Sequence, residues 1–447
     1  MKWLVMLLDH LWIWGLLIFG GLAYYGVAKK NRQENQAKKI LQKAVATGLD
    51  EPLSLHPEVD PAKCAGCGAC TKVCPEGDIL KMINSKAVLV SPTKCVGHGE
   101  CERACPFGAI DLVFGTKKRG VDIPRLSKNY ETNVPGLYIA GELGGMGLIR
   151  NAIKQGHQAA DHALSNLNPS VKSDTDVLVV GAGPAGLAVC LTAIVHKKRY
   201  LCIEQNTAGG TVYNFPRQKV VMTHPADLPG VGKMKFPRNV VSKEELLHYW
   251  NQVRQKVGIK IRENEKFEGL EKVGDHFKVK TSKAEYMAQK VVLAMGVRGS
   301  PRRLGLPNED TTGVAYNLID PAQYTNKKIA VVGGGNAGVE AAQMLANPKY
   351  KNQVTLLVRG PAFDRCNEDN KRIIEDMAQK KMVQIWYEAQ VKEIKKDQLN
   401  IERAGQLLDI ENDQLFVFAG AEMPFKFLMS LGVEINKAFG QKLKSGG

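Results

Sequence analysis

Apolar residues form one long uninterrupted run near the start of the chain and several short runs farther along. The long run extends from Leu11 to Ala28. Short aliphatic blocks of strand length, such as 176–180 and 328–332, lead directly into glycine-rich loops that precede apolar helices. Strands that alternate with such helices predict parallel sheets covered by helices, so the pattern favours an α/β architecture.

The long run has the length and the flanks of a membrane span. As a helix its residues would cover about 27 Å, which is enough for one bilayer crossing. One basic residue precedes it and six follow it, so everything after residue 30 is expected in the cytoplasm (Lys2; Lys29, Lys30, Arg32, Lys38, Lys39, Lys43). We expect an uncleaved single-pass helix in the inner, cytoplasmic membrane. The alternative is a cleaved signal peptide, but the start is nearly uncharged and lacks a clean cleavage site.

Composition and charge place the remainder among ordinary globular proteins. The 447 residues include 61 Lys plus Arg and 45 Asp plus Glu, a formal net charge of +16, with 24% charged and 44% hydrophobic residues. These values exclude a disordered, collagenous or multi-span membrane chain. The basic residues lack the aromatic interleaving of a nucleic-acid groove, so no nucleic-acid partner is expected.

Seven of the ten cysteines lie between residues 64 and 105, in two related motifs. The first is a complete C-x2-C-x2-C-x3-C-P run, a spacing typical of iron–sulfur ligands (Cys64, Cys67, Cys70, Cys74). In such a run the fourth cysteine binds a second cluster, which calls for a second motif. That motif is present, with a histidine at its second position (Cys95, His98, Cys101, Cys105). The doubled spacing disfavours a zinc site or free thiols.

The stretch from Val59 to Phe114 therefore resembles the bacterial two-cluster ferredoxin domain. The resemblance implies one 4Fe–4S cluster on Cys64, Cys67, Cys70 and Cys105, and a second cluster on Cys74, Cys95 and Cys101. Three possibilities stay open for the second site: His98 completes a 4Fe–4S cluster, the three cysteines hold a 3Fe–4S or labile cluster, or the site is empty. A histidine ligand raises a cluster's potential, so we expect two unequal centres, the first of low potential.

The first glycine-rich loop has the form G-x-G-x-x-G (Gly181, Gly183, Pro184, Ala185, Gly186). Its glycines permit a tight turn, close approach of a pyrophosphate, and close packing of helix on strand. The next strand, 200–203, ends in Glu204, 23 residues past Gly181. An acidic side chain in this place bonds a ribose hydroxyl, so the loop predicts a dinucleotide site.

A second copy of this loop lies farther along the chain (Gly333, Gly335, Asn336, Gly338). Its next strand, 354–358, is followed by Arg359 instead of an acidic residue. An arginine there accommodates a 2′-phosphate, which favours NADPH over NADH. The alternative is that Arg359 is a solvated surface residue.

Two such folds in one chain resemble the two-domain flavoprotein reductases of the thioredoxin-reductase-like branch, which includes ferredoxin–NADP reductases and bacillithiol-type disulfide reductases. Further matching features are the stretch 301–307 and short glycine-containing segments of the first fold (Glu204-Gln205, Gly209-Gly210, the strand end at Gly296). The resemblance implies FAD in the first fold, a nicotinamide cofactor in the second, and a homodimer.

That family ends with a strand, a Gly-Asp pair and a helix that covers the flavin. Here the matching segment lies upstream, at 130–142, with Gly141-Glu142 in place of the pair and a helix near 151–164. The chain is therefore expected to be circularly permuted, with the ferredoxin domain before the displaced FAD segment. The longer Glu142 side chain can still bond a hydroxyl of the FAD ribityl chain.

The predicted organisation has six parts. They are an anchor with its basic linker (1–50), a two-cluster ferredoxin-type domain (55–115), the displaced FAD segment (116–168), the FAD-binding domain (172–300), the NAD(P)-binding domain (301–412) and a return to the FAD domain (413–447).

The remaining cysteines form no pair suited to disulfide chemistry. The stretch 311–321, where thioredoxin reductases carry C-x-x-C, has no cysteine, and Ala185 stands where bacillithiol-type reductases carry theirs. We expect Cys190 and Cys202 in the core, and Cys366 in a loop with no partner nearby in sequence.

Together these features predict a membrane-anchored NAD(P)H-dependent FAD and iron–sulfur oxidoreductase, similar in function to a ferredoxin–NADP reductase with its ferredoxin built in. Its external electron donor or acceptor stays open between a ferredoxin, a quinone and another protein, and so does the direction of flow. The rival interpretations are a thiol-disulfide reductase, a non-catalytic redox sensor and a membrane assembly subunit.

Overall fold

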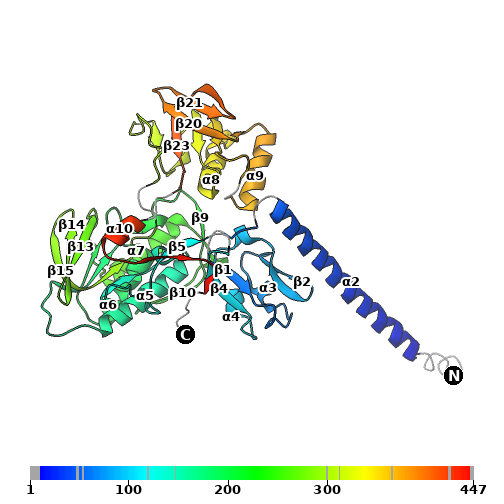
Figure 1. Ribbon diagram of the computed structural model, residues 1–447, viewed down its shortest axis with the longest axis horizontal. Helices are drawn as coiled ribbons and strands as arrows, with labels where there is room; N and C mark the ends of the chain where they lie inside the picture. The colour runs from blue at the N-terminus through cyan, green and yellow to red at the C-terminus, as the bar shows by residue number, and fades with distance from the viewer. Residues whose placement is uncertain are drawn as a thin grey trace. The chain divides into compact units, whose positions relative to one another are not determined.

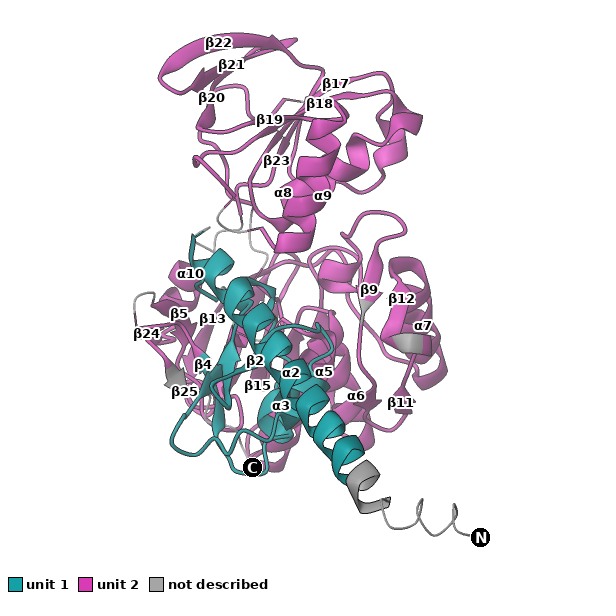
Figure 2. Ribbon diagram, turned by 90° about the vertical axis from the view of Figure 1, so that its right-hand side faces the viewer, with its two compact units in different colours: residues 1–113 teal, residues 114–447 magenta. Residues whose placement is uncertain are grey.

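The computed structural model describes residues 11–46, 50–52, 55–117, 120–145, 147–297, 301–311, 313–363, 366–420 and 424–442. Of residues 11–15, 222, 238 and 441–442 it describes the backbone alone. The chain forms two compact units, residues 1–113 and 114–447, which Figure 2 distinguishes by colour.

The first described element of unit 1 is the 36-residue helix α2 (Leu11–Ala46; Figure 1). Its first part exposes large apolar side chains, with Leu16 62% and Phe19 72% exposed. Its second part buries Ala37, and the helix lies against strand β2 (Leu80–Ile83). Within the described residues, no helix combines the length and the apolar character that a membrane crossing requires. Residues 1–10, which flank the predicted span, lie outside the described residues.

The rest of unit 1 is a small α+β domain. Strand β1 pairs antiparallel with β4, and β2 forms a hairpin with β3. The hairpin turns through Asn84 and Ser85, whose φ angles of 50° and 57° suit a two-residue hairpin turn. The elements are β1 (His56–Val59), α3 (Ala69–Val73), β2, β3 (Lys86–Leu89), α4 (Glu100–Arg103) and β4 (Ile110–Phe114).

Unit 2 contains two folds, and the first is built on a mixed six-stranded sheet, in which β14 pairs antiparallel with β13 and β15 and the other pairs are parallel. Its strands run in the order β13-β14-β15-β7-β8, and β6 also pairs with β15. The strands are β6 (Leu137–Ile139), β7 (Thr175–Val180), β8 (Tyr200–Ile203), β13 (Phe267–Val273), β14 (His276–Thr281) and β15 (Glu285–Leu293). The accompanying helices are α5 (Ile149–Ser165), α6 (Pro184–Val195) and α7 (Lys243–Val257), with short strands β9 (Val220–Met222), β10 (Ala226–Leu228), β11 (Gly232–Met234) and β12 (Val240–Ser242).

The segment predicted to be displaced is built into this sheet. Strand β6 runs parallel to the end of β15, with Leu137 opposite Val291. Helix α5 packs closely on α6. The absence of a side chain at Gly156 permits this approach, since a β-carbon there would lie only 2.2 Å from the carbonyl oxygen of Ala185. Residues that precede the first glycine-rich loop in the chain thus complete the fold to which that loop belongs.

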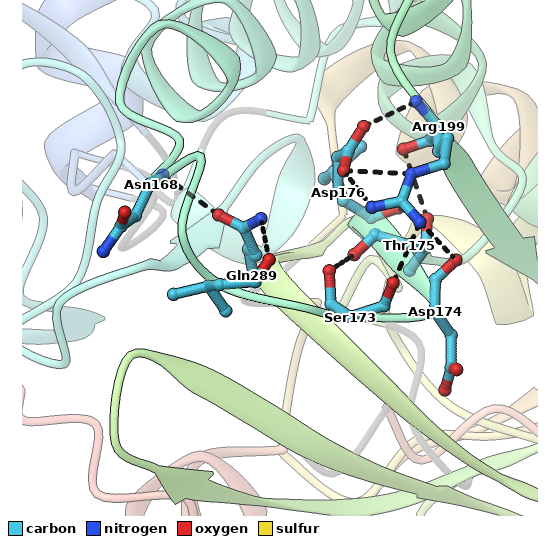
Figure 3. A network of polar contacts seen from close by, with 9 residues as sticks. Asn168, Ser173, Asp174, Thr175, Asp176, Arg199 and Gln289 are labelled. Carbon is cyan, nitrogen blue, oxygen red and sulfur yellow. Dashed lines mark hydrogen bonds and ion pairs between the residues drawn. The ribbon is translucent and has the colours of Figure 1, made fainter.

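A polar network secures the connection between α5 and β7 (Figure 3). The buried Gln289 side chain of β15 accepts from the Asn168 N–H at 3.0 Å and donates to the Val171 carbonyl at 3.1 Å. Arg199 bonds the Asp176 carboxylate through Nη2 at 2.6 Å and the Ser173 carbonyl through Nη1 at 2.9 Å. The polar linker is therefore fixed along the start of β7.

The second fold of unit 2 carries a five-stranded parallel sheet in the order β16-β23-β17-β18-β19. A three-stranded antiparallel sheet, β20-β21-β22, is inserted in the sequence between β19 and β23. The strands are β16 (Val314–Ala315), β17 (Lys328–Val332), β18 (Gln353–Leu357), β19 (Gln384–Trp386), β20 (Ala389–Ile394), β21 (Gln398–Arg403), β22 (Gln406–Glu411) and β23 (Gln414–Val417). Its helices are α8 (Asn336–Leu345) and α9 (Glu368–Gln379).

One predicted boundary is wrong. The return to the FAD domain was expected from residue 413, but β23 lies between β16 and β17 in the second sheet. Its apolar residues are buried there because a central parallel strand is covered on both faces. The return follows β23: Leu428 of α10 (Phe425–Ser430) packs in the core of the first fold, and β24 (Ile435–Ala438) pairs with β5 (Val121–Pro124). The last described strand is β25 (Gln441–Lys442).

Candidate cluster and dinucleotide sites

The first cysteine pocket combines residues from both motifs. Cys64, Cys67 and Cys70 line it together with Cys105 of the second motif. Burial and then the neighbouring Cys64, Cys105 and Cys67 raise the pKa of the Cys70 thiol, so the four sulfurs lie within electrostatic reach of one another. This is the ligand set that the ferredoxin resemblance implies for the first cluster.

The second pocket brings together the other four predicted ligands, Cys74, Cys95, His98 and Cys101. Burial raises the pKa of Cys95 to about 11 and that of Cys101 to about 12, with the negative charge of nearby cysteines adding to both. Thiols in such a site are protonated at neutral pH, so iron binding would release protons.

His98 takes the same backbone position in its motif as Cys67 takes in the first. Glycines on both sides of each residue have left-handed φ angles, 75° and 71° around Cys67 and 77° and 77° around His98 (Gly66, Gly68; Gly97, Gly99). The His98 side chain is 11% exposed, and its Nε2 lies 3.6 Å from a carboxylate oxygen of Glu76. Glu76, which also lines the second pocket, was not identified from the sequence.

The two pockets present the ligand types that iron–sulfur clusters use. Across the described ranges of the chain, no three His, Cys, Asp or Glu side chains converge tightly enough to hold one metal ion. A cluster presents several irons, one to each ligand, so its ligands lie farther apart. Two groups of four soft or imidazole ligands in mostly apolar pockets fit that chemistry.

The first glycine-rich loop joins β7 to α6. A β-carbon at Gly186 would lie 1.9 Å from the Gly181 carbonyl oxygen, so this glycine allows the helix to approach the strand. Pro184 is the first residue of α6, and Ala185 is buried. The Glu204 carboxylate, 8% exposed, follows β8 and accepts from the N–H groups of Ala182 at 2.9 Å and Asn206 at 3.0 Å.

Two other glycine segments meet this loop. The Gly209 N–H donates to the Ala182 carbonyl at 3.0 Å, and a β-carbon at Gly210 would lie 3.0 Å from the Cα of Gly183. A β-carbon at Gly141, from the displaced segment, would lie 3.1 Å from that of Ala185. Glu142, directly after Gly141, is half-buried.

These residues leave room for a cofactor. A β-carbon at Gly183 would meet only Gly210, at 3.9 Å, and one at Gly296, after β15, would meet nothing within 4 Å. Gln205 is exposed beside the buried Glu204. Small residues at the start of α6 therefore form an open cradle at a helix N-terminus, which suits the pyrophosphate of FAD.

The second glycine-rich loop repeats this construction between β17 and α8. A β-carbon at Gly338 would lie 2.3 Å from the Gly333 carbonyl, and Gly335 is the N-cap of α8. Arg359 is exposed, two residues beyond β18. The side-chain oxygen of Asn336 accepts from the N–H of Asn367 at 2.8 Å and so ties the start of α8 to that of α9.

Comparison with known proteins agrees with this construction. Residues 178–443 match the profile of the pyridine nucleotide-disulphide oxidoreductases. The chain belongs to this family. Residues 56–106 match the profile of the 4Fe-4S dicluster domain. The protein is therefore a flavoprotein oxidoreductase that binds FAD and NAD(P) and carries a 4Fe–4S dicluster domain.

Relatives within the family include two kinds of reductase. The ferredoxin–NADP reductase of Ignicoccus hospitalis is 30% identical over 264 residues, covering 58% of this chain and 82% of its own. The bacilliredoxin reductase Bdr of Bacillus subtilis is 27% identical over 280 residues, covering 59% and 82%. The solved structure of the bacillithiol disulfide reductase Bdr from Bacillus cereus matches with a TM-score of 0.53 and 26% identity, covering 58% and 82%.

The cysteines outside the cluster domain of this oxidoreductase are buried core residues. A hydrogen bond with Cys190 and burial raise the pKa of Cys202 well above its usual value, and both side chains are buried. Cys366 lies in a loop, as expected, and its side chain is fully buried in the core of the second fold; this burial raises its pKa to about 12. Thiols with such pKa values are poor nucleophiles.

We expect Cys105→Ser to remove the first cluster although Cys105 belongs to the second motif, because its thiol lines the first pocket. Cys101→Ser, the same change four residues earlier, should instead alter the second cluster. Each variant should lose about half of the iron, since each cluster is held by its own set of ligands. Iron analysis and electron paramagnetic resonance of the reduced protein measure both effects. Loss of the same signal in the two variants would contradict the exchange of ligands between motifs.

Proposed function

We propose that this oxidoreductase transfers electrons between NADPH and an external one-electron carrier, in the manner of a ferredoxin–NADP reductase with its ferredoxin attached. FAD supplies exchange of two electrons with a nicotinamide and of single electrons with iron–sulfur clusters. The observation that carries the proposal is the presence of two cysteine-lined pockets in one chain with two dinucleotide folds. The tether raises the effective concentration of one site at the other to about the mM range.

The residues of the chain bind and orient in this scheme. The loop Gly181–Gly186 would hold the FAD pyrophosphate at the start of α6, and Glu204 would bond its ribose. Glu142 would bond the ribityl chain from the displaced segment. Arg359 would bind the 2′-phosphate of NADPH beside the second loop.

For the second pocket, we favour His98 as the fourth iron ligand. Its ring lines the pocket with three cysteines, and the flanking glycines repeat the backbone around Cys67. A neutral imidazole in place of a thiolate makes the cluster less negative and so raises its potential. The second cluster would then be the stronger electron acceptor of the two.

The thiol-disulfide alternative has less support. The relatives of this protein include disulfide reductases. However, the described thiols of its two nucleotide folds are buried, and the pKa values of Cys202 and Cys366 are raised. The cysteines that share pockets are those suited to iron. One-electron transfer through clusters therefore accounts for more of the cysteines than disulfide reduction does.

Anaerobic titration with NADPH tests the proposed function. We expect the flavin absorbance to bleach and a reduced-cluster resonance signal to appear as NADPH is added. The shape of the second cluster's signal, compared with that of His98→Cys, tests the histidine ligand. Absence of bleaching with both NADPH and NADH would reject the reductase, and bleaching with silent clusters would reject this direction of flow.

Replacing Arg359 with alanine should raise the KM for NADPH about tenfold and leave that for NADH within about twofold, because only NADPH carries the phosphate that a guanidinium binds. Arg372→Ala is the matched control, since Arg372 is an exposed arginine on α9 of the same fold. Steady-state kinetics with both nucleotides measure the effect. Equal weakening of NADPH and NADH would contradict the assigned role.

We also infer that the apolar run 11–28, of which the side chains of 11–15 lie outside the described part of the structure, anchors the protein in the inner membrane, with the cofactor domains in the cytoplasm. Support comes from the exposed apolar side chains between Leu16 and Val27 and from the basic residues that follow them. The membrane would then hold the electron exit near a quinone or a membrane-bound protein partner.

Deleting residues 1–28 should move the protein from the membrane fraction to the soluble fraction, because that stretch contains the apolar run. Turnover with NADPH and a one-electron dye should stay within about twofold, since the deleted residues lie outside both nucleotide folds. As a control, Leu407→Ser removes an exposed leucine of β22 and should leave the distribution unchanged. Recovery of the intact chain in the soluble fraction would contradict the anchor.

A further inference from the structure

One cation is fixed directly on the loop of the first cysteine pocket. The Lys86 ammonium donates to the main-chain carbonyl of Cys64 at 2.6 Å, in a partly buried position. Its neighbour in β3, Ala87, lines the same pocket as Cys64. The carbonyl oxygen and the ligand sulfur both belong to Cys64. The ammonium bonded to this carbonyl therefore lies close to a sulfur that would bind the cluster.

The hairpin turn before Lys86 fixes this arrangement. A β-carbon at Gly66 would lie 2.3 Å from the Ser85 carbonyl oxygen, so the cysteine loop and the turn are in direct contact. Helix α2 holds the other side of the turn: Lys30 donates to the Ser85 hydroxyl at 3.3 Å, and the Glu34 carboxylate accepts from the Asn84 N–H. The turn is thus held between a helix and the pocket.

We propose that the Lys86 ammonium, through its positive charge, raises the reduction potential of the first cluster. Reduction adds one negative charge to a cluster already surrounded by four thiolates, so a nearby fixed cation stabilises the reduced form more than the oxidised form. The inference rests on the proposed function only in taking the first pocket to be a redox-active cluster site.

The second pocket carries the opposite charge arrangement. There the carboxylate of Glu76 lies 3.6 Å from His98, and Glu76 lines the pocket itself. The histidine ligand makes the reduction potential of the second cluster higher than that of the first. The lysine raises the potential of the first cluster and the carboxylate lowers that of the second, so both charges reduce this difference in potential. The two potentials are thereby brought closer, which favours electron transfer between the clusters in either direction.

The test is a redox titration with chemical reductant and mediators, followed by paramagnetic resonance, with no nucleotide present. It therefore succeeds or fails independently of the NADPH pathway. The first cluster's signal is the one that Cys105→Ser abolishes. We expect Lys86→Gln to lower that cluster's potential by the equivalent of about a tenfold change in its reduction equilibrium, about 59 mV for one electron.

Two variants serve as controls. Lys86→Arg keeps the charge and should keep the potential. Lys81→Gln removes a lysine from the same hairpin, but the Lys81 ammonium pairs with Asp78 at 2.5 Å, so its removal should leave the first cluster unchanged.

An unchanged potential in Lys86→Gln would overturn the proposal. An equal shift in Lys86→Arg would also overturn it, since packing and not charge would then be responsible. The signal reports loaded molecules alone, so partial loss of iron does not obscure the midpoint. Complete loss of the first cluster in both Lys86→Gln and Lys86→Met, with Lys86→Arg intact, would make the residue a structural clamp and overturn the electrostatic role.

Discussion

The parallel pairing of β6 with the end of β15 is the constraint on which the rest of unit 2 depends. It brings a segment from the N-terminal side of the first glycine-rich loop into the sheet that carries this loop. Gly141 then reaches Ala185, and Gly156 lets α5 lie directly on α6. Without this pairing, the first fold would lack both a strand and the helix that covers α6, and Glu142 would have no place beside the cofactor cradle.

Local motifs were readable from the sequence because their chemistry is local. The glycines of both dinucleotide loops and the cysteines of both cluster motifs act within a few residues of one another, so spacing alone identifies them. The sequence prediction places β23 in the wrong fold because an apolar strand looks the same in either sheet, and the partners of β23 are distant in sequence. The contact of Asn336 with Asn367 could not be predicted either, because it is made across the fold.

Lys86 and Glu76 could not be found from spacing. Each depends on a turn or loop that carries its charge to another part of the domain, and neither belongs to a recognised motif. The displaced segment is recognisable in the sequence because it resembles the end of the flavoprotein fold. The sheet register that joins it to β15 required the structure.

The duplicated backbone of the cysteine loops separates fold from ligand chemistry. Left-handed glycines on either side of Cys67 and His98 set the path of each loop. The side chain between them can therefore change from thiolate to imidazole without a change in the chain's course. Two electronically different centres can be built on one repeated framework.

The permuted order also determines when each part of the fold can form during synthesis. A ribosome releases β6 and α5 before β7, α6 and β15 have been made. The ferredoxin-type domain precedes them all and can fold as soon as it emerges. The apolar face of α5 has no partner helix until the linker, β7 and then α6 have been synthesised. In a chain of this order, β6 and α5 are both translated before the strand and the helix against which they pack.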